Sequence, residues 1–263
     1  MIRTVAVHLD IELGGPTNMV FGVGVAQGAS ILSEELTFDP ENPPEVTELL
    51  DQHGTRLHAL DVDGGKMRVE YRVEVEGRAA PATTEPLDLI RYLRPSRYCE
   101  SDSLNAIARS QFWGLSGHVL LNAVVGWVSD KLSYVSGSSQ PTDGAVRTLS
   151  DGRGVCRDYA HVVIALLRAL DVPARMVAVY APGLDPMDFH AVVEAHIEGE
   201  WWLVDATRLA PRQTMLRIST GRDAADIAFL TNHGSDLVLA DMSVLAVVDE
   251  LPYDDGYQPI QLG

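Results

Sequence analysis

The sequence has little cysteine: Cys99 and Cys156 are the only two thiols in 263 residues. Two cysteines in a chain of this length do not form the disulfide framework that is typical of small secreted domains. A bridge between them would bury the better nucleophile of the two, which stands at the start of a predicted helix. We therefore expect both thiols to be free.

A secretory leader and a membrane-spanning segment are also missing. Residues 1–4 lead directly into an alternating strand pattern, without the apolar stretch and cleavage site of a signal peptide. No uninterrupted apolar run reaches the length that a transmembrane helix requires. These features lead us to expect a cytoplasmic protein.

Basic residues are scarce, because 20 lysines and arginines stand against 37 aspartates and glutamates, a formal net charge of −17. A field of this sign repels phosphate backbones and anionic lipid surfaces. We therefore expect neither nucleic acid nor membrane as a partner. The composition, with 46% apolar and 22% charged residues, is that of an ordinary globular enzyme.

The first third of the chain shows the alternation of β-strands. Apolar residues recur at every second position over residues 5–11, and again over residues 66–76, where charged residues occupy the positions between them. Two weaker strand patterns occupy residues 20–26 and 31–38. Strands with one polar face predict an antiparallel β-sandwich.

Two segments have the composition of loops, residues 40–44 and residues 77–86. The pattern changes from strands to helices after the second of them. We therefore predict an N-terminal β-rich domain over residues 1–86 and a second, catalytic domain over residues 87–263. The fold class expected for the whole chain is α+β.

The second part of the chain is expected to combine helices with an antiparallel sheet. Helical spacing is present over residues 103–113 and 116–132, and residues 155–170 are apolar on nearly every side, as in a buried helix. A strand is predicted over residues 175–180, and a hairpin with its turn at 198–200 follows.

Cys156 lies at the start of the predicted buried helix, two positions after the sequence DGRG at 151–154. A helix N-terminus stabilises a thiolate through its free N–H groups and its dipole, and the thiolate is the nucleophilic form of cysteine. The alternative is a small, inert core residue, because free cysteines are often buried. On its own, Cys156 favours that alternative.

His190 and Asp205 shift the balance toward catalysis. His190 opens one strand of the predicted hairpin and Asp205 ends the other, so antiparallel pairing brings the two side chains together. The carboxylate then accepts from one imidazole nitrogen while the other nitrogen faces the thiol, which is the logic of nucleophile, base and orienting acid. A register slip of one residue would turn Asp205 to the wrong face.

Three segments resemble the core motifs of the transglutaminase-like superfamily: GVCRDYAH at 154–161, HAVVE at 190–194 and WWLVDAT at 201–207. The segments RPSRYC at 94–99 and GRDAAD at 221–226 are similar to flanking parts of bacterial members that carry an N-terminal β-domain. The resemblance implies a papain-like core in which the cysteine lies on a buried helix packed on an antiparallel sheet. Its motifs are specific for fold and much less so for reaction.

The resemblance also implies roles for single residues. Cys156 would attack a carboxamide or peptide carbonyl and form a thioester, His190 would transfer the proton, and Asp205 would hold the imidazole. The Cys156 backbone N–H and a second donor would bind the oxyanion. Tyr134 is the first candidate for this donor, with a core tyrosine as the alternative, and Gln140 is the second.

The two adjacent tryptophans and the histidines are weaker candidates. Trp201 and Trp202 face opposite sides of one strand, so one is expected in the core and the other in the substrate groove. His190 and His196 share a strand face, but no acidic or cysteine ligand stands at a spacing typical of zinc. We expect no metal and no cofactor.

Three functions remain open at this point. The first is a cysteine peptidase or amidase acting on a peptide, a protein or a small amide. The second is an acyltransferase that passes the acyl group to an amine, and the third is a binding scaffold without turnover. The intact set of Cys156, His190 and Asp205 disfavours a scaffold. The short chain, without the calcium-binding insertions of animal crosslinking enzymes, favours hydrolysis.

Overall fold

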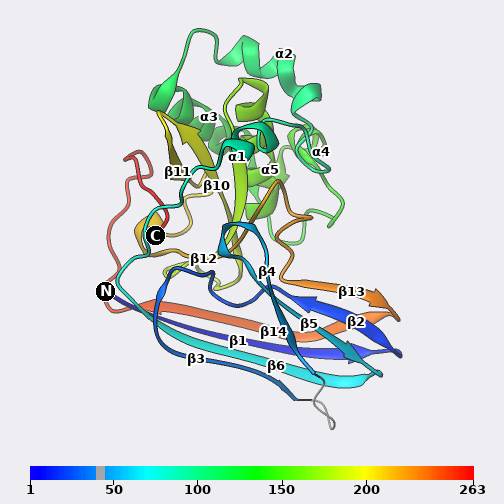
Figure 1. Ribbon diagram of the computed structural model, residues 1–263. Coiled ribbons are helices and arrows are strands. Elements are labelled where there is room, and N and C mark those ends of the chain that lie inside the picture. Colours follow the sequence, from blue (N-terminus) through cyan, green and yellow to red (C-terminus); the bar gives the residue numbers. More distant parts are fainter. Residues whose placement is uncertain (40–44) are drawn as a thin grey trace.

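The computed structural model describes residues 1–39 and 45–263, so the loop expected over residues 40–44 lies outside the described residues. The architecture is mixed α+β, with mostly antiparallel sheets, as the sequence predicts. Figure 1 shows two parts: long strands form a sandwich at one end of the molecule, and helices surround a second antiparallel sheet at the other.

The sandwich consists of two four-stranded antiparallel sheets. The first has the order β14-β1-β6-β3, with β14 (Leu237–Val248), β1 (Ile2–Leu13), β6 (Gly65–Glu76) and β3 (Ser30–Asp39). The second has the order β13-β2-β5-β4, with β13 (Leu230–Gly234), β2 (Thr17–Phe21), β5 (Arg56–Val62) and β4 (Thr47–Leu50). A short 3₁₀ turn, η1 (Gln52–Gly54), joins β4 to β5.

Alternation of apolar and polar residues positions the strands of the sandwich. In β1 and β6 the apolar set is buried, and the register pairs Val5 with Val73 and Val7 with Tyr71. The strands predicted over 31–38 and 66–76 are confirmed. The strand predicted over 20–26 is only partly formed, because β2 ends at Phe21, and the chain beyond it is buried without continuing the ladder.

The predicted assignment of all residues after 87 to one catalytic domain needs a correction. Strand β14 pairs with β1, and β13 pairs with β2, so residues 230–248 return to the N-terminal sandwich. In Figure 1 both strands lie among the long strands of the sandwich. The N-terminal domain is therefore completed by a segment that is distant in sequence.

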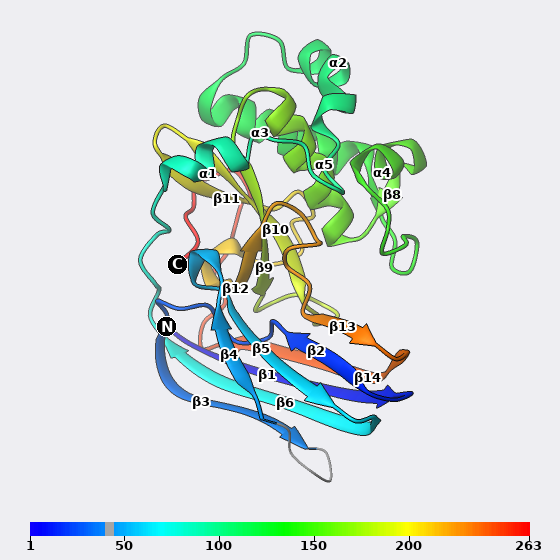
Figure 2. The ribbon, with the colours of Figure 1, turned by 45° about the vertical axis from the view of Figure 1, so that its right-hand side comes forward.

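The other part of the molecule contains a four-stranded antiparallel sheet of order β11-β10-β9-β12. Its strands are β9 (Ala174–Tyr180), β10 (His190–Ile197), β11 (Glu200–Val204) and β12 (Leu216–Gly221), with η2 (Arg212–Thr214) before β12. Its helices are α1 (Pro86–Arg91), α2 (Ser101–Gln111), α3 (Gly117–Lys131), α4 (Ala145–Asp151) and α5 (Cys156–Ala169). Figure 2 shows helices α2 to α5 on the side of this sheet that is remote from the sandwich. Within residues 1–39 and 45–263, no helix is long and apolar enough to cross a membrane.

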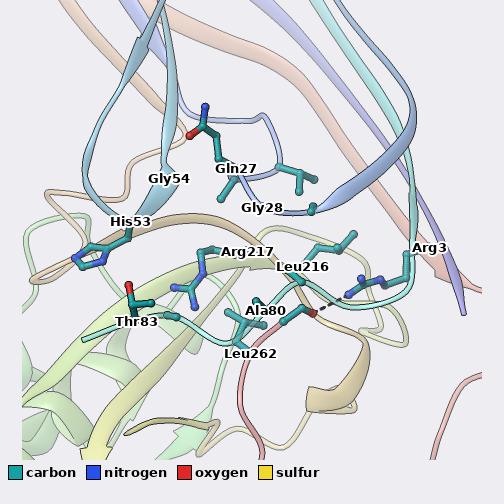
Figure 3. Close-up of a pocket in the computed structure, with 16 residues that line it drawn as sticks. Arg3, Gln27, Gly28, His53, Gly54, Ala80, Thr83, Leu216, Arg217 and Leu262 are labelled. Atoms are coloured by element: carbon teal, nitrogen blue, oxygen red, sulfur yellow. Dashed lines mark hydrogen bonds between the residues drawn. The ribbon is translucent and has the colours of Figure 1, made fainter. Parts of the chain in front are cut away.

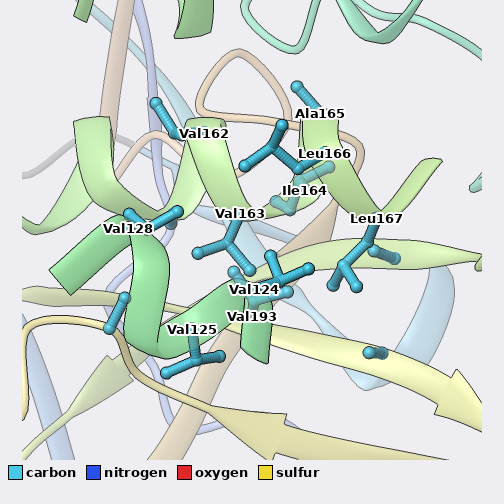
Figure 4. Packing of buried hydrophobic residues seen from close by; sticks show 14 of the residues in the cluster. Val124, Val125, Val128, Val162, Val163, Ile164, Ala165, Leu166, Leu167 and Val193 are labelled. Atoms are coloured by element: carbon cyan, nitrogen blue, oxygen red, sulfur yellow. The ribbon is translucent and has the colours of Figure 1, made fainter. Parts of the chain in front are cut away.

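Helix α5 is the centre of the hydrophobic core of this part. Residues 158–169 of this helix are all buried, as the apolar pattern predicts. Figure 4 shows valines 124, 125 and 128 of α3 and Val193 of β10 packed around its apolar side chains. Burial on all sides fixes the helix, and with it the position of its first residue, Cys156.

A buried network of charges joins the sandwich to the β11-β10-β9-β12 sheet. Arg175 of β9 donates from Nε to Oε2 of Glu194 at 2.8 Å, and Arg217 donates from Nη2 to Oε1 of the same carboxylate at 2.6 Å. The Nη1 group of Arg175 lies 3.2 Å from Nδ1 of His53, a residue of η1, and 3.8 Å from Oδ2 of Asp88. The network fixes β10, which begins with His190, relative to the sandwich.

Candidate active site

Cys156 is the first residue of α5, and its thiol is free and half-buried. Asp158 determines where the helix begins, because its Oδ2 accepts a hydrogen bond from the Val155 N–H at 2.8 Å. A side chain at Gly154 would place its Cβ only 2.6 Å from Cβ of Asp158. A glycine is therefore required before the nucleophile, and this turn presents Cys156 at the helix N-terminus.

Tyr134 lies beside the same turn. It belongs to β7 (Ser133–Tyr134), which pairs in parallel with β8 (Arg153–Gly154) and places Tyr134 opposite Gly154. Burial and the neighbouring Cys156 raise the pKa of Tyr134 to about 12, although the Cys156 backbone N–H acts on the phenol in the opposite direction. The hydroxyl therefore keeps its proton at neutral pH, next to the Cys156 backbone amide.

The hairpin of β10 and β11 brings His190 and Asp205 together. Val193 pairs with Val204, and this register leaves Asp205, at the end of β11, facing the start of β10. His190 Nε2 lies 2.7 Å from Asp205 Oδ2, and both side chains are almost completely buried. The other imidazole nitrogen, Nδ1, is buried and forms no hydrogen bond with any described residue.

The charges around the imidazole favour its protonated form. Burial alone lowers the pKa of His190, but the Asp205 carboxylate and the Cys156 side chain raise it to about 10. Burial acts to raise the pKa of Asp205, and His190 and Thr207 bring it below its ordinary value. The imidazole therefore has the Asp205 carboxylate on Nε2 and the Cys156 side chain as a neighbour, an arrangement compatible with an activated thiol.

Thr207 is a part of the site that sequence reasoning missed. Its backbone N–H and its hydroxyl both donate to Asp205 Oδ1, at 2.8 and 2.7 Å, so the two carboxylate oxygens have separate partners. The signal in the sequence is a threonine two positions after an aspartate, which is the spacing of a local side-chain turn. Thr207 thereby fixes the carboxylate that orients His190.

Replacing Thr207 with valine is expected to lower the rate of alkylation of Cys156 at neutral pH by about tenfold, because Asp205 loses one of two donors on Oδ1. Thr207→Ser retains the hydroxyl and is expected to restore the rate. The measurement is the pH profile of iodoacetamide labelling of Cys156. Equal profiles for the valine variant and the unmodified protein would remove Thr207 from the site.

The remaining predicted site residues lie elsewhere. Gln140 is exposed, and its main chain binds Arg157 and Asp143 rather than Cys156. Trp201 is 1% exposed and lies under the guanidinium of Arg175, 3.9 Å from its ring centroid, so the predicted groove role for Trp201 is corrected to packing. Trp202 packs its ring on His118 and donates to the Ile197 carbonyl at 3.1 Å, on the helix side of the sheet.

Two cavities lie next to the β11-β10-β9-β12 sheet. The larger of the two, about 320 Å³, lies where the sandwich meets the β11-β10-β9-β12 sheet, and Arg3, His53 and Arg217 line it (Figure 3). Cys156, His190 and Asp205 are not among the residues that line it. The smaller, about 210 Å³, borders Asp205. Among the described residues, no group of three or more histidine, cysteine or acidic side chains is arranged to hold a metal ion.

Comparison with known proteins gives the family. Residues 120–206, which include Cys156, His190 and Asp205, match the family model for the transglutaminase-like superfamily. The crystal structure of a candidate cysteine protease from Cytophaga hutchinsonii superposes with a TM-score of 0.90 and 32% sequence identity, and the match covers 100% of this chain and 98% of that one. The chain belongs to the transglutaminase-like superfamily.

Two further relatives are more distant. The periplasmic domain of TgpA from Pseudomonas aeruginosa is 21% identical, with a TM-score of 0.44, over 77% of this chain and 87% of that one. An uncharacterised protein of Mycobacterium leprae is 29% identical over 138 residues, 49% of each chain. The match thus spans about half the length of this curated relative.

Proposed function

We propose that this protein is a cysteine-dependent amide hydrolase that forms a thioester acyl-enzyme on Cys156. The observation that carries the proposal is the position of His190, with Asp205 on one nitrogen and the helix-terminal thiol of Cys156 on the side of the other. Buried imidazolium and carboxylate groups in this order are typical of an activated thiol nucleophile. The proposed substrate is a peptide, a protein or a small amide.

The proposed reaction begins with a thiolate at Cys156 and an imidazolium at His190. The sulfur attacks the amide carbon, and the carbonyl oxygen becomes an oxyanion as the carbon becomes tetrahedral. His190 then gives its Nδ1 proton to the amide nitrogen, the carbon–nitrogen bond breaks, and an amine leaves. The neutral imidazole next removes a proton from water, whose oxygen attacks the thioester and releases a carboxylic acid and the Cys156 thiolate.

The oxyanion is proposed to lie between the Cys156 backbone N–H and the Tyr134 hydroxyl. Both donors are on rigid elements, one at the first turn of α5 and the other on the strand paired with β8. Fixed donors stabilise charge that develops in the transition state without further reorganisation.

Removing the Tyr134 hydroxyl with Tyr134→Phe is expected to lower kcat by about 10²-fold and to leave KM nearly unchanged, because an oxyanion forms only in the transition state. Steady-state kinetics on a hydrolysed peptide give the two constants separately. Val135→Ala, a neighbouring exposed position, is the matched control. An unchanged kcat in Tyr134→Phe would assign the tyrosine to packing against Tyr159.

Water and an amine compete for the same thioester, so acyl transfer is the alternative reaction. The test incubates the protein with a mixture of synthetic peptides, with and without a primary amine, and follows the products by mass spectrometry. Hydrolysis predicts a carboxylic acid product whose yield is little affected by the amine. A product carrying the amine would make the protein an acyltransferase, and no product in either case would favour a binding scaffold.

A cytoplasmic location remains part of the proposal.

A further inference from the structure

The smaller cavity, which borders Asp205, is lined in part by an arginine that has no acidic partner among the described residues. Arg208, Pro211, Tyr253 and Asp254 are among the residues that line it together with Asp205. His190 separates Asp205 from the thiol, so the cavity lies at the far end of the row formed by Cys156, His190 and Asp205.

Two aspartates and two arginines line this cavity, and among the described residues Arg208 is the one without an ion-pair partner. Asp205 is already bound to His190, and Asp254 forms a two-pronged ion pair with Arg212, at 2.8 and 2.9 Å. Arg208 forms no ion pair or hydrogen bond through its guanidinium within residues 1–39 and 45–263. In a chain with a net charge of −17, an unneutralised arginine beside the catalytic carboxylate needs an explanation.

Local structure holds Arg208 in its place. Its backbone has a φ of 54°, a left-handed conformation that non-glycine residues adopt with strain and that occurs preferentially at functional sites. Its guanidinium carbon lies 4.6 Å from the ring centroid of Tyr257. Gly256 leaves the room for the side chain, because a Cβ there would lie 3.3 Å from Arg208 Nε.

From these observations we propose that Arg208 and the cavity beside Asp205 form a subsite for a substrate carboxylate, either an acidic side chain or a peptide C-terminus. A guanidinium held by an aromatic ring keeps its planar fork of N–H donors, which matches the two oxygens of a carboxylate. The inference rests on the proposed function and assigns the substrate of the same site to acidic peptides. Because the net charge of the chain is −17, an acidic peptide is repelled by the molecule as a whole. We therefore expect the preference for a carboxylate to depend on Arg208.

A simpler role for Arg208 is to fasten the C-terminal segment through Tyr257. A cation–π contact at an exposed position is weak, and it leaves the N–H donors free. The two roles differ in one readout. Fastening predicts no discrimination between a carboxylate and its amide, whereas a subsite predicts discrimination that disappears with the guanidinium.

The test measures binding without turnover, in the full chain carrying Cys156→Ala. N-acetylglutamate and N-acetylglutaminamide, which carries no carboxylate, are titrated separately, and two-dimensional NMR gives the affinity and the residues that shift. We expect N-acetylglutamate to bind about tenfold more tightly, which corresponds to one charge-assisted interaction. The largest shifts are expected in residues 208–211 and 252–256.

Arg208→Gln is expected to abolish the preference, and Arg208→Lys to retain part of it. Arg97→Gln is the matched control, because Arg97 is another exposed arginine stacked on a tyrosine, 4.8 Å from the Tyr98 ring centroid. Equal binding of the two probes, no binding of N-acetylglutamate at these residues, or a preference that survives Arg208→Gln would overturn the subsite. A failure to detect hydrolysis would remove the proposed function and leave this result readable.

Discussion

Replacing Cys156 with alanine is expected to lower amide hydrolysis by at least ~10⁴-fold, because the acyl group is bonded to its sulfur in every proposed intermediate. His190→Ala is expected to cause a loss of similar size, since the remaining thiol has no imidazole for proton transfer. The double variant is expected to be no worse than either single variant, because the two groups act as one unit. The measurement is kcat/KM on a peptide that the unmodified protein hydrolyses.

The matched control for this prediction is Cys99→Ala. Cys99 is completely buried, and burial raises the pKa of its thiol far above the ordinary range, so it is not a nucleophile. Its replacement is expected to preserve most of the activity and to cost some stability. Substantial hydrolysis by Cys156→Ala would contradict the proposed mechanism, whichever residue then proved responsible.

Glu194→Gln is expected to destabilise the protein by about 3–5 kcal/mol, because it leaves two arginines near a neutral amide in the interior. Arg175 is completely buried, and Arg217 is 13% exposed. Urea unfolding gives the change in the free energy of unfolding. The control is Glu12→Gln, which breaks an exposed ion pair with Lys66 and is expected to cost less than about 1 kcal/mol.

The loss of stability in Glu194→Gln is expected to depend on pH. Burial alone raises the pKa of Glu194, but Arg217 and Arg175 lower it from 4.5 to about 2. The ionised carboxylate therefore contributes stability that is complete above pH 4.5 and is lost as the pH falls through about 2, on the order of 3 kcal/mol. The difference between the two proteins should shrink over that interval. A difference that does not change with pH would show that packing, and not charge, is what the variant removes.

The elements with strong local patterns were predictable from the sequence. The alternation in β6 and the all-round apolar pattern of α5 need no information from distant residues, and each is present as predicted. The hairpin of β10 and β11 was predictable for the same reason, because its turn fixes the register of residues only a few positions apart. That register decides the meeting of His190 and Asp205.

Features that depend on distant pairing escaped the sequence analysis. Strand β14 pairs with β1 across more than two hundred positions, and nothing in its own pattern identifies that partner. The two-residue strand β7 is too short to show a period. The sequence therefore placed Tyr134 near Cys156 only through the resemblance to the superfamily. The sequence left open whether Trp201 or Trp202 lies in the core. The buried Arg175, whose guanidinium covers the Trp201 ring, places Trp201 there.

Labelling of Cys156 with iodoacetamide across pH, in the unmodified protein and in His190→Ala, tests the central claim most directly. Because the pKa of His190 is raised to about 10, the imidazolium persists beside the sulfur through neutral pH. We predict fast labelling at pH 6–8 that varies little with pH, and in His190→Ala slower labelling that follows an ordinary thiol with a pKa of about 8.5. Peptide mass mapping separates Cys156 from the buried Cys99. Identical profiles for the two proteins would contradict the thiolate–imidazolium pair and the enzyme built on it.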